Sequence, residues 1–398
     1  MSVNNSSFQR NCNISLIANR IRKNTGNTRV QIAEDLNLYK SSVTNIVSIL
    51  LENKIIKESS ETISNTMQGR KAKILRMNPE VGNIVGIEIN PQYFKIVFVN
   101  FAGETIYKDG GTMPKLSFTE MIDYVMNKVI SISKLLSKKI LSINFGIAGI
   151  IDSRNGVISY FNEMDIHNFD IYEYGIKKYG IPFYCDNDAH CCSWYELVQR
   201  QNDHLGDFLT VYSVRQSEMI VGNEKRFTGI GIGMSMVVNN SVYSGKNFKS
   251  GEYLSSSWNG DSDCQSGISK DILKDALTDE KSFRIWFADL CISLIPIISV
   301  LDINTLFLLG KSFADKDKIL NYLEKDSPNL YRLLKRENIT LDFEKENDFI
   351  VAKGSALMFL QKLFNVPTLK EVKDKTYIEW DGLFDFLKNG EINEKTKK

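Results

Sequence analysis

The chain has 398 residues, of which 43% are hydrophobic and 24% are charged, and this is enough for two or three folded domains. Its net charge of +1 hides an asymmetry, because residues 1–80 hold 12 Lys and Arg against 6 Asp and Glu, whereas the remainder holds 37 against 42. A polar N-terminus, six cysteines without a Cys-x-x-Cys pair and an apolar run (290–301) too short for a bilayer exclude a secreted or membrane protein and indicate the cytoplasm.

The first two predicted elements are short helices. Residues 14–25 repeat apolar side chains at helical spacing, and a second helix follows Thr28. Thr28 and Gln31 match a capping box, in which each side chain satisfies a backbone amide that a first helical turn leaves free. Asn37 suits the tight turn after that helix, because Asn tolerates a left-handed backbone.

A third helix, predicted over residues 40–54, has two contrasting faces. One face is apolar, with side chains at the spacing i, i+3, i+4 and i+7: Val43, Ile46, Val47 and Leu50. The opposite face carries small, uncharged side chains that can form hydrogen bonds: Ser41, Ser42, Thr44, Asn45 and Ser48. A helix of this kind after a tight turn is typical of a helix-turn-helix, in which it presents such side chains to base edges in the major groove.

Residues 55–58 and 74–77 can form two strands around a loop with a basic end. That end holds three cations: Arg70, Lys71 and Lys73. Cations at the tip of such a loop suit contacts with DNA phosphates. We therefore predict a winged helix-turn-helix DNA-binding domain over residues 1–80, with double-stranded operator DNA as its partner. The alternative is an ordinary three-helix bundle with a solvated polar face.

The remaining chain, residues 81–398, alternates predicted strands and helices. Apolar runs at residues 84–89 and 93–100 predict a β-hairpin, residues 117–137 predict a helix, and residues 181–186 predict a strand that leads into another helix. This alternation predicts an α/β architecture with two lobes and a cleft. The last junction has the sequence Asp-Asn-Asp-Ala-His-Cys-Cys, which is compatible with a catalytic centre, a metal site or a milder role.

A Gly-rich segment carries the most specific resemblance to a known family. Residues 229–245, GIGIGMSMVVNNSVYSG, resemble the Gly-x-Gly-Ile-Gly loop and hairpin of the ROK family (repressors, open reading frames, kinases). Gly251 and Glu252 stand where the family has a Gly-Glu pair, and residues 69–79 resemble the link between its wing and sugar domain. The resemblance implies a winged helix-turn-helix followed by a two-lobed, actin-like and sugar-kinase-like domain.

The resemblance also implies a sugar-binding site. Residues 186–190 lie on the family's Glu-Asn-Asp-Ala-Asn motif, and Asp188 has the position of the kinase base. The implied sugar-binding residues are Asn162, Asn187, Asp188 and Glu252. We expect the helix dipole and the free amides to keep Asp188 ionised. Zinc binding by His190, Cys191 and Cys192 is the less favoured alternative to buried thiols, because adjacent helical residues point about 100° apart.

Departures from the family indicate a domain without kinase activity. Its phosphate-binding turn has the pattern Asp-x-Gly-Gly-Thr, whereas residues 88–92 of this chain are Glu-Ile-Asn-Pro-Gln, with no glycine and one amide fewer. Ile230 and Gly310-Lys311 depart from other nucleotide-binding positions. Ser255 replaces a zinc-binding His, and Cys264 is the remaining one of three cysteines, so we expect no metal, no cofactor and a vestigial base at Asp188.

Together these features predict a DNA-binding transcriptional repressor of sugar-utilisation genes, without enzymatic activity and controlled by a small-molecule sugar effector. A homodimer or higher homo-oligomer would read a palindromic operator with two recognition helices. Two alternatives stay open. One is an active sugar kinase of the same family, and the other is a ligand-independent regulator controlled by a protein partner.

Overall fold

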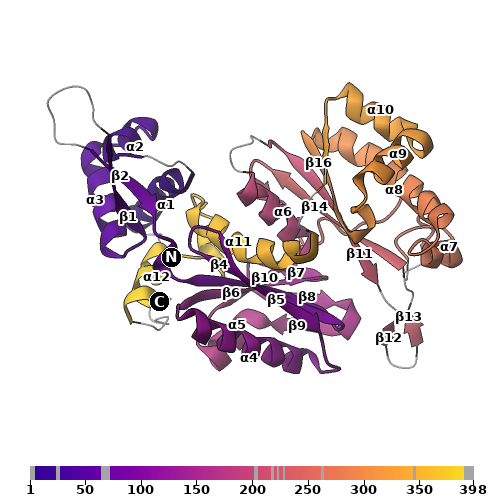
Figure 1. Cartoon of the computed structure of the whole chain (residues 1–398), viewed down its shortest axis with the longest axis horizontal. Coiled ribbons are helices and arrows are strands. Elements are labelled where there is room, and N and C mark those ends of the chain that lie inside the picture. Colours follow the sequence, from indigo (N-terminus) through magenta and orange to yellow (C-terminus); the bar gives the residue numbers. More distant parts are fainter. Residues whose placement is uncertain are drawn as a thin grey trace.

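The computed structural model describes residues 5–23, 27–63, 72–200, 205–216, 219–221, 224–226, 229–260, 264–343 and 347–389. It consists of an N-terminal helical head and a body built on two five-stranded sheets, and the C-terminal helix lies beside the head (Figure 1). The predicted α/β class is therefore confirmed.

The head contains three helices and a two-stranded antiparallel sheet. Its elements are α1 (Asn5–Lys23), α2 (Arg29–Asp35), α3 (Lys40–Glu52), β1 (Ile56–Ile63) and β2 (Ala72–Met77). The predicted capping box is confirmed, because Gln31 N–H donates to Thr28 Oγ1 at 3.3 Å and Thr28 N–H donates to Gln31 Oε1 at 3.0 Å. Asn37 has the expected left-handed backbone, with φ 51°, and the apolar face of α3 is buried as predicted.

The first helix is longer than its sequence pattern predicts, because it packs against the other end of the chain. α1 begins at Asn5 rather than near residue 14, and it contacts α12 (Trp380–Asn389). Trp380 Nε1 donates a hydrogen bond to Ser15 Oγ at 2.9 Å. Tertiary contacts thus extend a helix that local periodicity could not define.

The first sheet has the strand order β10-β6-β3-β4-β5. Its strands are β3 (Asn83–Ile89), β4 (Tyr93–Asn100), β5 (Thr105–Thr112), β6 (Ile140–Ile147) and β10 (Phe183–Asn187). β3 and β4 form the predicted antiparallel hairpin, and β6 lies parallel to both β3 and β10. One face is covered by α4 (Phe118–Leu136) and α5 (Ile171–Tyr179), near a small sheet of β7 (Ile150–Asp152), β8 (Val157–Phe161) and β9 (Ile166–Asp170) (Figure 1).

The second sheet has the strand order β15-β14-β11-β16-β17. Its strands are β11 (Phe208–Gln216), β14 (Gly229–Val238), β15 (Ser241–Val242), β16 (Thr305–Gly310) and β17 (Thr340–Asp342). The helices of this lobe are α7 (Lys270–Asp275), α8 (Glu280–Leu301), α9 (Lys316–Asp326) and α10 (Pro328–Arg336), and β12 (Met219–Val221) pairs with β13 (Glu224–Arg226).

By length and composition alone, α8 could cross a membrane. Its Trp286, Leu290 and Leu294 side chains are nevertheless buried, in one apolar cluster with residues of β11 and β16. α8 therefore packs one face into the core, whereas Ile292 and Val300 on its remaining surface are exposed, so it is less buried than the sequence predicts.

Two helices lie between the sheets and pack directly on each other: α6 (Asp188–Gln199) and α11 (Ile350–Phe364) (Figure 1). A glycine allows their close approach, because a Cβ atom on Gly354 would overlap the carbonyl oxygen of Cys191. α11 also packs on β3, β4 and β6, while α6 packs on β14. The start of α6 is thereby held in place between the two lobes.

Candidate functional site

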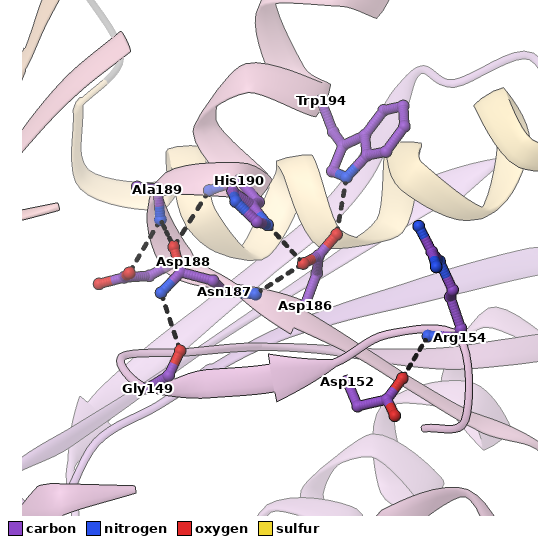
Figure 2. A network of polar contacts seen from close by, with 9 residues as sticks. All are labelled: Gly149, Asp152, Arg154, Asp186, Asn187, Asp188, Ala189, His190 and Trp194. Atoms are coloured by element: carbon purple, nitrogen blue, oxygen red, sulfur yellow. Dashed lines mark hydrogen bonds and ion pairs between the residues drawn. The ribbon is translucent and has the colours of Figure 1, made fainter. Parts of the chain in front are cut away.

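The start of α6, directly after β10, holds two of the predicted sugar-binding residues. Asn187 is the N-cap: its Oδ1 accepts from Ala189 N–H at 2.9 Å and from His190 N–H at 3.3 Å, and its Nδ2 donates to the Gly149 carbonyl at 3.0 Å (Figure 2). Asp188 is 9% exposed, and its Oδ1 accepts from Ala189 N–H at 2.8 Å. Among the residues that the structure describes, Asp188 Oδ2 has no hydrogen-bond partner, so this oxygen is open to a ligand.

Asp186 and His190 form a buried structural pair. His190 Nδ1 and Asp186 Oδ1 are 2.8 Å apart, and Trp194 Nε1 donates to Asp186 Oδ2 at 3.0 Å (Figure 2). Burial opposes ionisation of Asp186, but His190 and Trp194 hold its pKa below the usual value. Burial also acts to lower the pKa of His190, and the Asp186 carboxylate raises it overall. These two side chains therefore stabilise the start of α6, while His190 Nε2 is buried without a hydrogen-bond partner among the residues that the structure describes.

Cys191 and Cys192 are buried in α6 and pack as apolar side chains. Burial raises the pKa of both thiols well above the usual value. Within the described ranges, no group of three or more His, Cys, Asp or Glu side chains could hold a metal ion. The Cys-Cys pair is therefore part of the core around α6.

The pKa of Asp188 is higher than that of an ordinary aspartate. Burial, together with the negative charges of Glu88 and Glu252, raises this pKa to about 6, although the Ala189 N–H lowers it. The amide at the helix N-terminus favours the ionised carboxyl, as predicted, but removal from solvent outweighs it, so the net pKa is raised. With a pKa of about 6, Asp188 is still mostly ionised at neutral pH and takes up a proton in mildly acidic solution.

Glu252 is brought beside Asp188 by the Gly-rich strand β14. Glu252 pairs with Gly233 in an isolated antiparallel bridge. A Cβ atom on Gly233 would lie 3.8 Å from Asp188 Oδ1, so both acids neighbour this glycine. Gly251 has φ +92°, and a side chain there would overlap the Met234 carbonyl oxygen. Partial desolvation raises the pKa of Glu252 as well, although the residue remains exposed to solvent.

The turn between β3 and β4, residues 90–92, has no amide left to bind a phosphate. Asn90 N–H donates to the Tyr93 carbonyl oxygen at 3.0 Å, and Gln92 N–H donates to Asn90 Oδ1 at 3.0 Å. Pro91 has no N–H to donate. The turn therefore lacks the set of free amides that cradles phosphate oxygens in other folds.

Glu88, at the end of β3, also has both carboxylate oxygens occupied. Oε1 accepts from Tyr93 OH at 2.7 Å, and Oε2 forms an ion pair with Lys95 Nζ at 3.0 Å. Sequence reasoning missed Tyr93 and Lys95. The hairpin register could have indicated them, because it places Lys95 directly opposite Glu88 and Tyr93 two residues away on the same face.

Asn162 and its neighbour lie on a single helical turn, Asn162–Met164. Asn162 Oδ1 accepts from Tyr160 OH at 2.8 Å. Glu163 connects this turn to the β3–β4 turn, because Asn90 Nδ2 donates to Glu163 Oε2 at 2.8 Å. Burial and the charge of Asp188 raise the pKa of Glu163 to about 7. Glu163 is thus a further acid near Asp188 that the sequence did not single out.

A surface cavity of about 570 Å³ lies elsewhere on the molecule. It is lined by residues of α8 and its start, together with one residue of α9: Asp279, Glu280, Lys281, Arg284, Ile285, Ala288 and Asp326. It includes none of the predicted sugar-binding residues, so we do not assign it to the sugar.

On the head, the polar face of α3 points outward. Ser41, Thr44 and Asn45 are exposed, and Ser42 is half-buried. Tyr39, which directly precedes α3, is 84% exposed and was missed by sequence reasoning. An aromatic residue at an N-cap position, where it cannot cap the helix, was the signal that could have indicated it.

The basic wing residues are only partly described. Lys73 forms an ion pair with Glu58, which also pairs with Arg29 at 3.2 Å. Arg70 and Lys71 lie outside the residues that the structure describes. A phosphate contact by Lys73 would therefore require its ammonium to leave Glu58 or to be shared with it.

The sequence matches a known family over part of its length. Residues 84–253 match the model of the ROK family. Relatives named xylose repressor include those of Caldicellulosiruptor bescii (23% identical, 61% of this chain and 57% of the relative) and Staphylococcus xylosus (21%, 61% and 59%). The repressor of Bacillus subtilis (strain 168) is 24% identical over 63% of this chain and 62% of its own length. The chain thus spans less than two thirds of the length of these relatives.

Solved structures share the fold. A ROK family transcriptional regulator, a homologue of the Escherichia coli MLC protein, has a TM-score of 0.67 at 13% identity, with 92% of this chain and 99% of that chain covered. A ROK hexokinase from Thermus thermophilus has a TM-score of 0.53 at 17% identity, with 70% and 98% covered. At these identities the likeness concerns the fold alone.

Proposed function

We propose that the chain, whose residues 84–253 match the ROK family model, is a transcriptional repressor of sugar-utilisation genes whose DNA binding responds to a sugar. One observation carries this proposal. Asp188 Oδ2 is open to a ligand, whereas the amides of residues 90–92 and both oxygens of Glu88 are already occupied. Such a site can accept hydrogen bonds from a polyol, and its β3–β4 turn offers no free amide to the phosphates of a nucleotide, which disfavours the kinase alternative.

The head, residues 1–80, is proposed to be the winged helix-turn-helix, and residues 81–398 the effector-binding and dimerisation domain. α2 and α3, joined through the left-handed turn at Asn37, would form the helix-turn-helix, and β1 and β2 the wing. α3 would enter the major groove with its outward face: Ser41, Ser42, Thr44 and Asn45. The exposed ring of Tyr39 extends this surface.

The proposed effector is a monosaccharide bound by Asn162, Asn187, Asp188 and Glu252. The relatives named xylose repressor make D-xylose the first candidate. Carboxylate oxygens accept hydrogen bonds from sugar hydroxyls, and the second hydrogen of Asn187 Nδ2 can donate one.

A continuous set of contacts supports coupling between this site and the head. α6 packs on α11, and α11 contacts α1: Ser15 Oγ donates to the Leu363 carbonyl at 3.2 Å, and the Arg22 guanidinium lies 4.9 Å from the centre of the Phe364 ring. α1 is also held at the start of α12, because Asn11 Nδ2 of α1 donates to a carboxylate oxygen of Glu379, the residue before α12, at 3.1 Å. A sugar that shifts α6 against α11 would therefore change the placement of the head.

On DNA, a cytoplasmic homodimer is proposed to read a palindromic operator with its two copies of α3. Arg70, Lys71 and Lys73 would contact phosphates and supply affinity that does not depend on sequence. The side chains of α3 would contact base edges and supply specificity.

Operator titration by fluorescence anisotropy tests the sugar response. The probe is a palindromic DNA site selected from a random pool, titrated with and without D-xylose. Wild-type protein should change its operator Kd when the sugar is added. Asp188→Ala should bind the operator normally but lose this change, because a ligand shifts an equilibrium only through different affinities for the two states. A full response in Asp188→Ala would contradict the site assignment.

The same titration separates the contribution of the wing to DNA affinity from the contribution of α3 to sequence specificity. Replacing Arg70 and Lys71 with Ala should weaken binding to all DNA alike and lower its salt dependence, because fewer counterions are released. Asn45→Ala should cost about 1–3 kcal/mol on the operator and leave non-specific binding unchanged. If Arg70→Ala changed the base preference instead, the wing would be a reader of sequence.

A further inference from the structure

The segment that follows Glu252, described over residues 253–260 and 264–268, is hydrogen-bonded to one carboxylate of α8. Asp289 Oδ2 accepts a hydrogen bond from Ser255 Oγ at 2.6 Å and another from Ser266 Oγ at 2.9 Å. Ser255 lies three residues after Glu252, and Ser266 lies eleven residues further along the chain. A single oxygen atom therefore ties two separate points of this segment to α8.

Further hydrogen bonds complete this serine cluster. Ser255 Oγ lies 3.2 Å from Ser293 Oγ, which in turn accepts from Ser256 N–H at 2.8 Å. Ser257 Oγ accepts from Gly267 N–H at 3.1 Å. Ser255 is 5% exposed and Ser293 is 2% exposed. Water therefore competes little for the bond between Ser255 and Ser293, and a buried network of this kind restricts the residues that it joins to one arrangement.

A second anchor fixes the same segment to β14. The side chain of Gln265 pairs with the backbone of Ile232 in both directions, since Ile232 N–H donates to Oε1 at 2.8 Å and Nε2 donates to the Ile232 carbonyl at 2.7 Å. Glu252 bridges to the next residue of β14, Gly233. Glu252 is thus held between an anchor on β14 and the anchor at Asp289.

We infer that Asp289 is a positioning residue for effector binding, which keeps Glu252 beside Asp188 by fixing the segment through Ser255 and Ser266. This inference rests on the proposed function, because it takes Glu252 as a sugar contact. Asp289 accepts two hydroxyl hydrogens at one atom and so cross-links Ser255 and Ser266 to α8. Its effect on the sugar passes through Glu252 and not through contact with the sugar.

Hydrogen exchange measured by mass spectrometry tests the anchor. In Asp289→Ala, the amides of residues 251–260 and 264–268 should exchange at least about tenfold faster, while those of α8 and β14 keep their rates. Asp289→Asn still offers an oxygen to the hydroxyls and should give intermediate rates. Asp326→Ala is the matched control: it removes the same charge from an ion pair with Arg284 of α8 at 2.6 Å, outside the serine cluster. Wild-type rates in these segments of Asp289→Ala, or faster exchange throughout α8, would overturn the inference.

A double-mutant cycle tests whether Asp289 acts through Glu252. With D-xylose as the probe in isothermal titration calorimetry, Asp289→Ala should raise the Kd about tenfold in the wild-type background but less than about twofold in Glu252→Gln. Losses that multiply independently would overturn the inference. If wild-type protein does not bind D-xylose, the proposed effector fails, and hydrogen exchange alone then decides whether Asp289 holds the segment.

Discussion

The start of α6 and the β3–β4 turn border the same site with the same kinds of groups, carboxylates and backbone amides, but use them in opposite ways. At α6, Asn187 caps the first free amides, and within the described part of the chain one carboxylate oxygen of Asp188 has no hydrogen-bond partner. At the turn, residues 90–92 have no free N–H, and Glu88 has both oxygens occupied.

This difference separates binding from phosphoryl transfer within one fold. Binding a sugar requires acceptors that are still free, and Asp188 provides one. Phosphoryl transfer also requires donors that hold the phosphate oxygens as charge develops on them. In the β3–β4 turn the N–H groups of Asn90 and Gln92 are already bonded within the turn, so the turn offers no free donor of this kind.

The largest expected effect is a complete absence of sugar phosphorylation. Purified protein with ATP, Mg²⁺ and D-xylose or D-glucose should form ADP no faster than solution without protein, because a base without a held phosphoryl donor transfers nothing. A coupled ADP assay measures this. Turnover that disappears in Asp188→Asn would break the comparison, since the turn would then hold phosphate despite its occupied amides.

The second effect tests how much the ion pair between Lys95 and Glu88 beside the turn contributes to stability. Lys95→Ala leaves the Glu88 carboxylate, whose side chain is 6% exposed, without its counter-charge. We expect the free energy of unfolding in urea to fall by about 3 kcal/mol, because an unpaired buried charge is costly. The double variant Glu88→Gln/Lys95→Met should regain most of this loss.

The control for Lys95 is Lys138→Ala, which removes an exposed ion pair with Glu80. Its free energy of unfolding should stay within experimental error of the wild-type value. Equal losses in the two lysine variants would show that the pair of Lys95 and Glu88 is no tighter than a surface contact.

The third effect is a pH dependence set by Asp188. Its pKa of about 6 in the folded protein lies above the usual 3.8, so folding takes up a proton between these values. The stability contributed by the neutral carboxyl is fully present below about pH 4 and is lost as the pH rises through about 6. Asp188→Asn cannot ionise and should therefore exceed the wild type in free energy of unfolding by about 2–3 kcal/mol at pH 8, with little difference at pH 4.

Urea denaturation at several pH values measures this difference. Glu163→Gln should show the same sign with a midpoint near pH 7, because burial and the charge of Asp188 raise the pKa of Glu163 to about 7. A gap between the wild type and Asp188→Asn that does not vary with pH would mean that Asp188 is as easily ionised as a surface carboxyl. Burial would then have no effect on the charge of Asp188, and the comparison of α6 with the β3–β4 turn would rest on hydrogen bonds alone.

Much of the fold could be predicted because its signals are local. The capping box at Thr28 and the apolar stripe of α3 depend on residues within one or two helical turns. The start of α1 could not be predicted, because residues 5–13 are helical next to α12. The bond between Ser15 and Trp380 joins positions that are 365 residues apart in sequence.

In the candidate site, too, the features with a local sequence signal could be predicted, and those that depend on distant residues could not. The junction after β10 and the missing glycines of the β3–β4 turn are visible in the sequence. The pKa of Asp188 is not, because Glu88 and Glu252 approach it only in the folded chain. Asp289 likewise gives no local signal, since its serine partners lie more than 20 residues away.

The smallest expected effect separates two roles of Asn187. Asn187→Ala removes the cap of α6 and should lower the free energy of unfolding by about 1 kcal/mol. Asn187→Ser keeps an oxygen for the Ala189 N–H but loses the amide that donates to the Gly149 carbonyl. It should therefore recover most of the lost stability in urea denaturation.

Binding of D-xylose then decides whether Asn187 also contacts the sugar. One hydrogen of Nδ2 donates to Gly149, and the second is left for a sugar hydroxyl; a serine hydroxyl is too short to replace it. If the contact exists, Asn187→Ala and Asn187→Ser should both raise the Kd, by roughly fivefold, although only the first loses stability. Isothermal titration calorimetry measures this, with Asp326→Ala as a variant that should bind normally. If Asn187→Ser recovered affinity together with stability, Asn187 would serve as a cap alone, and Asp188 would be the group through which the start of α6 differs from the β3–β4 turn.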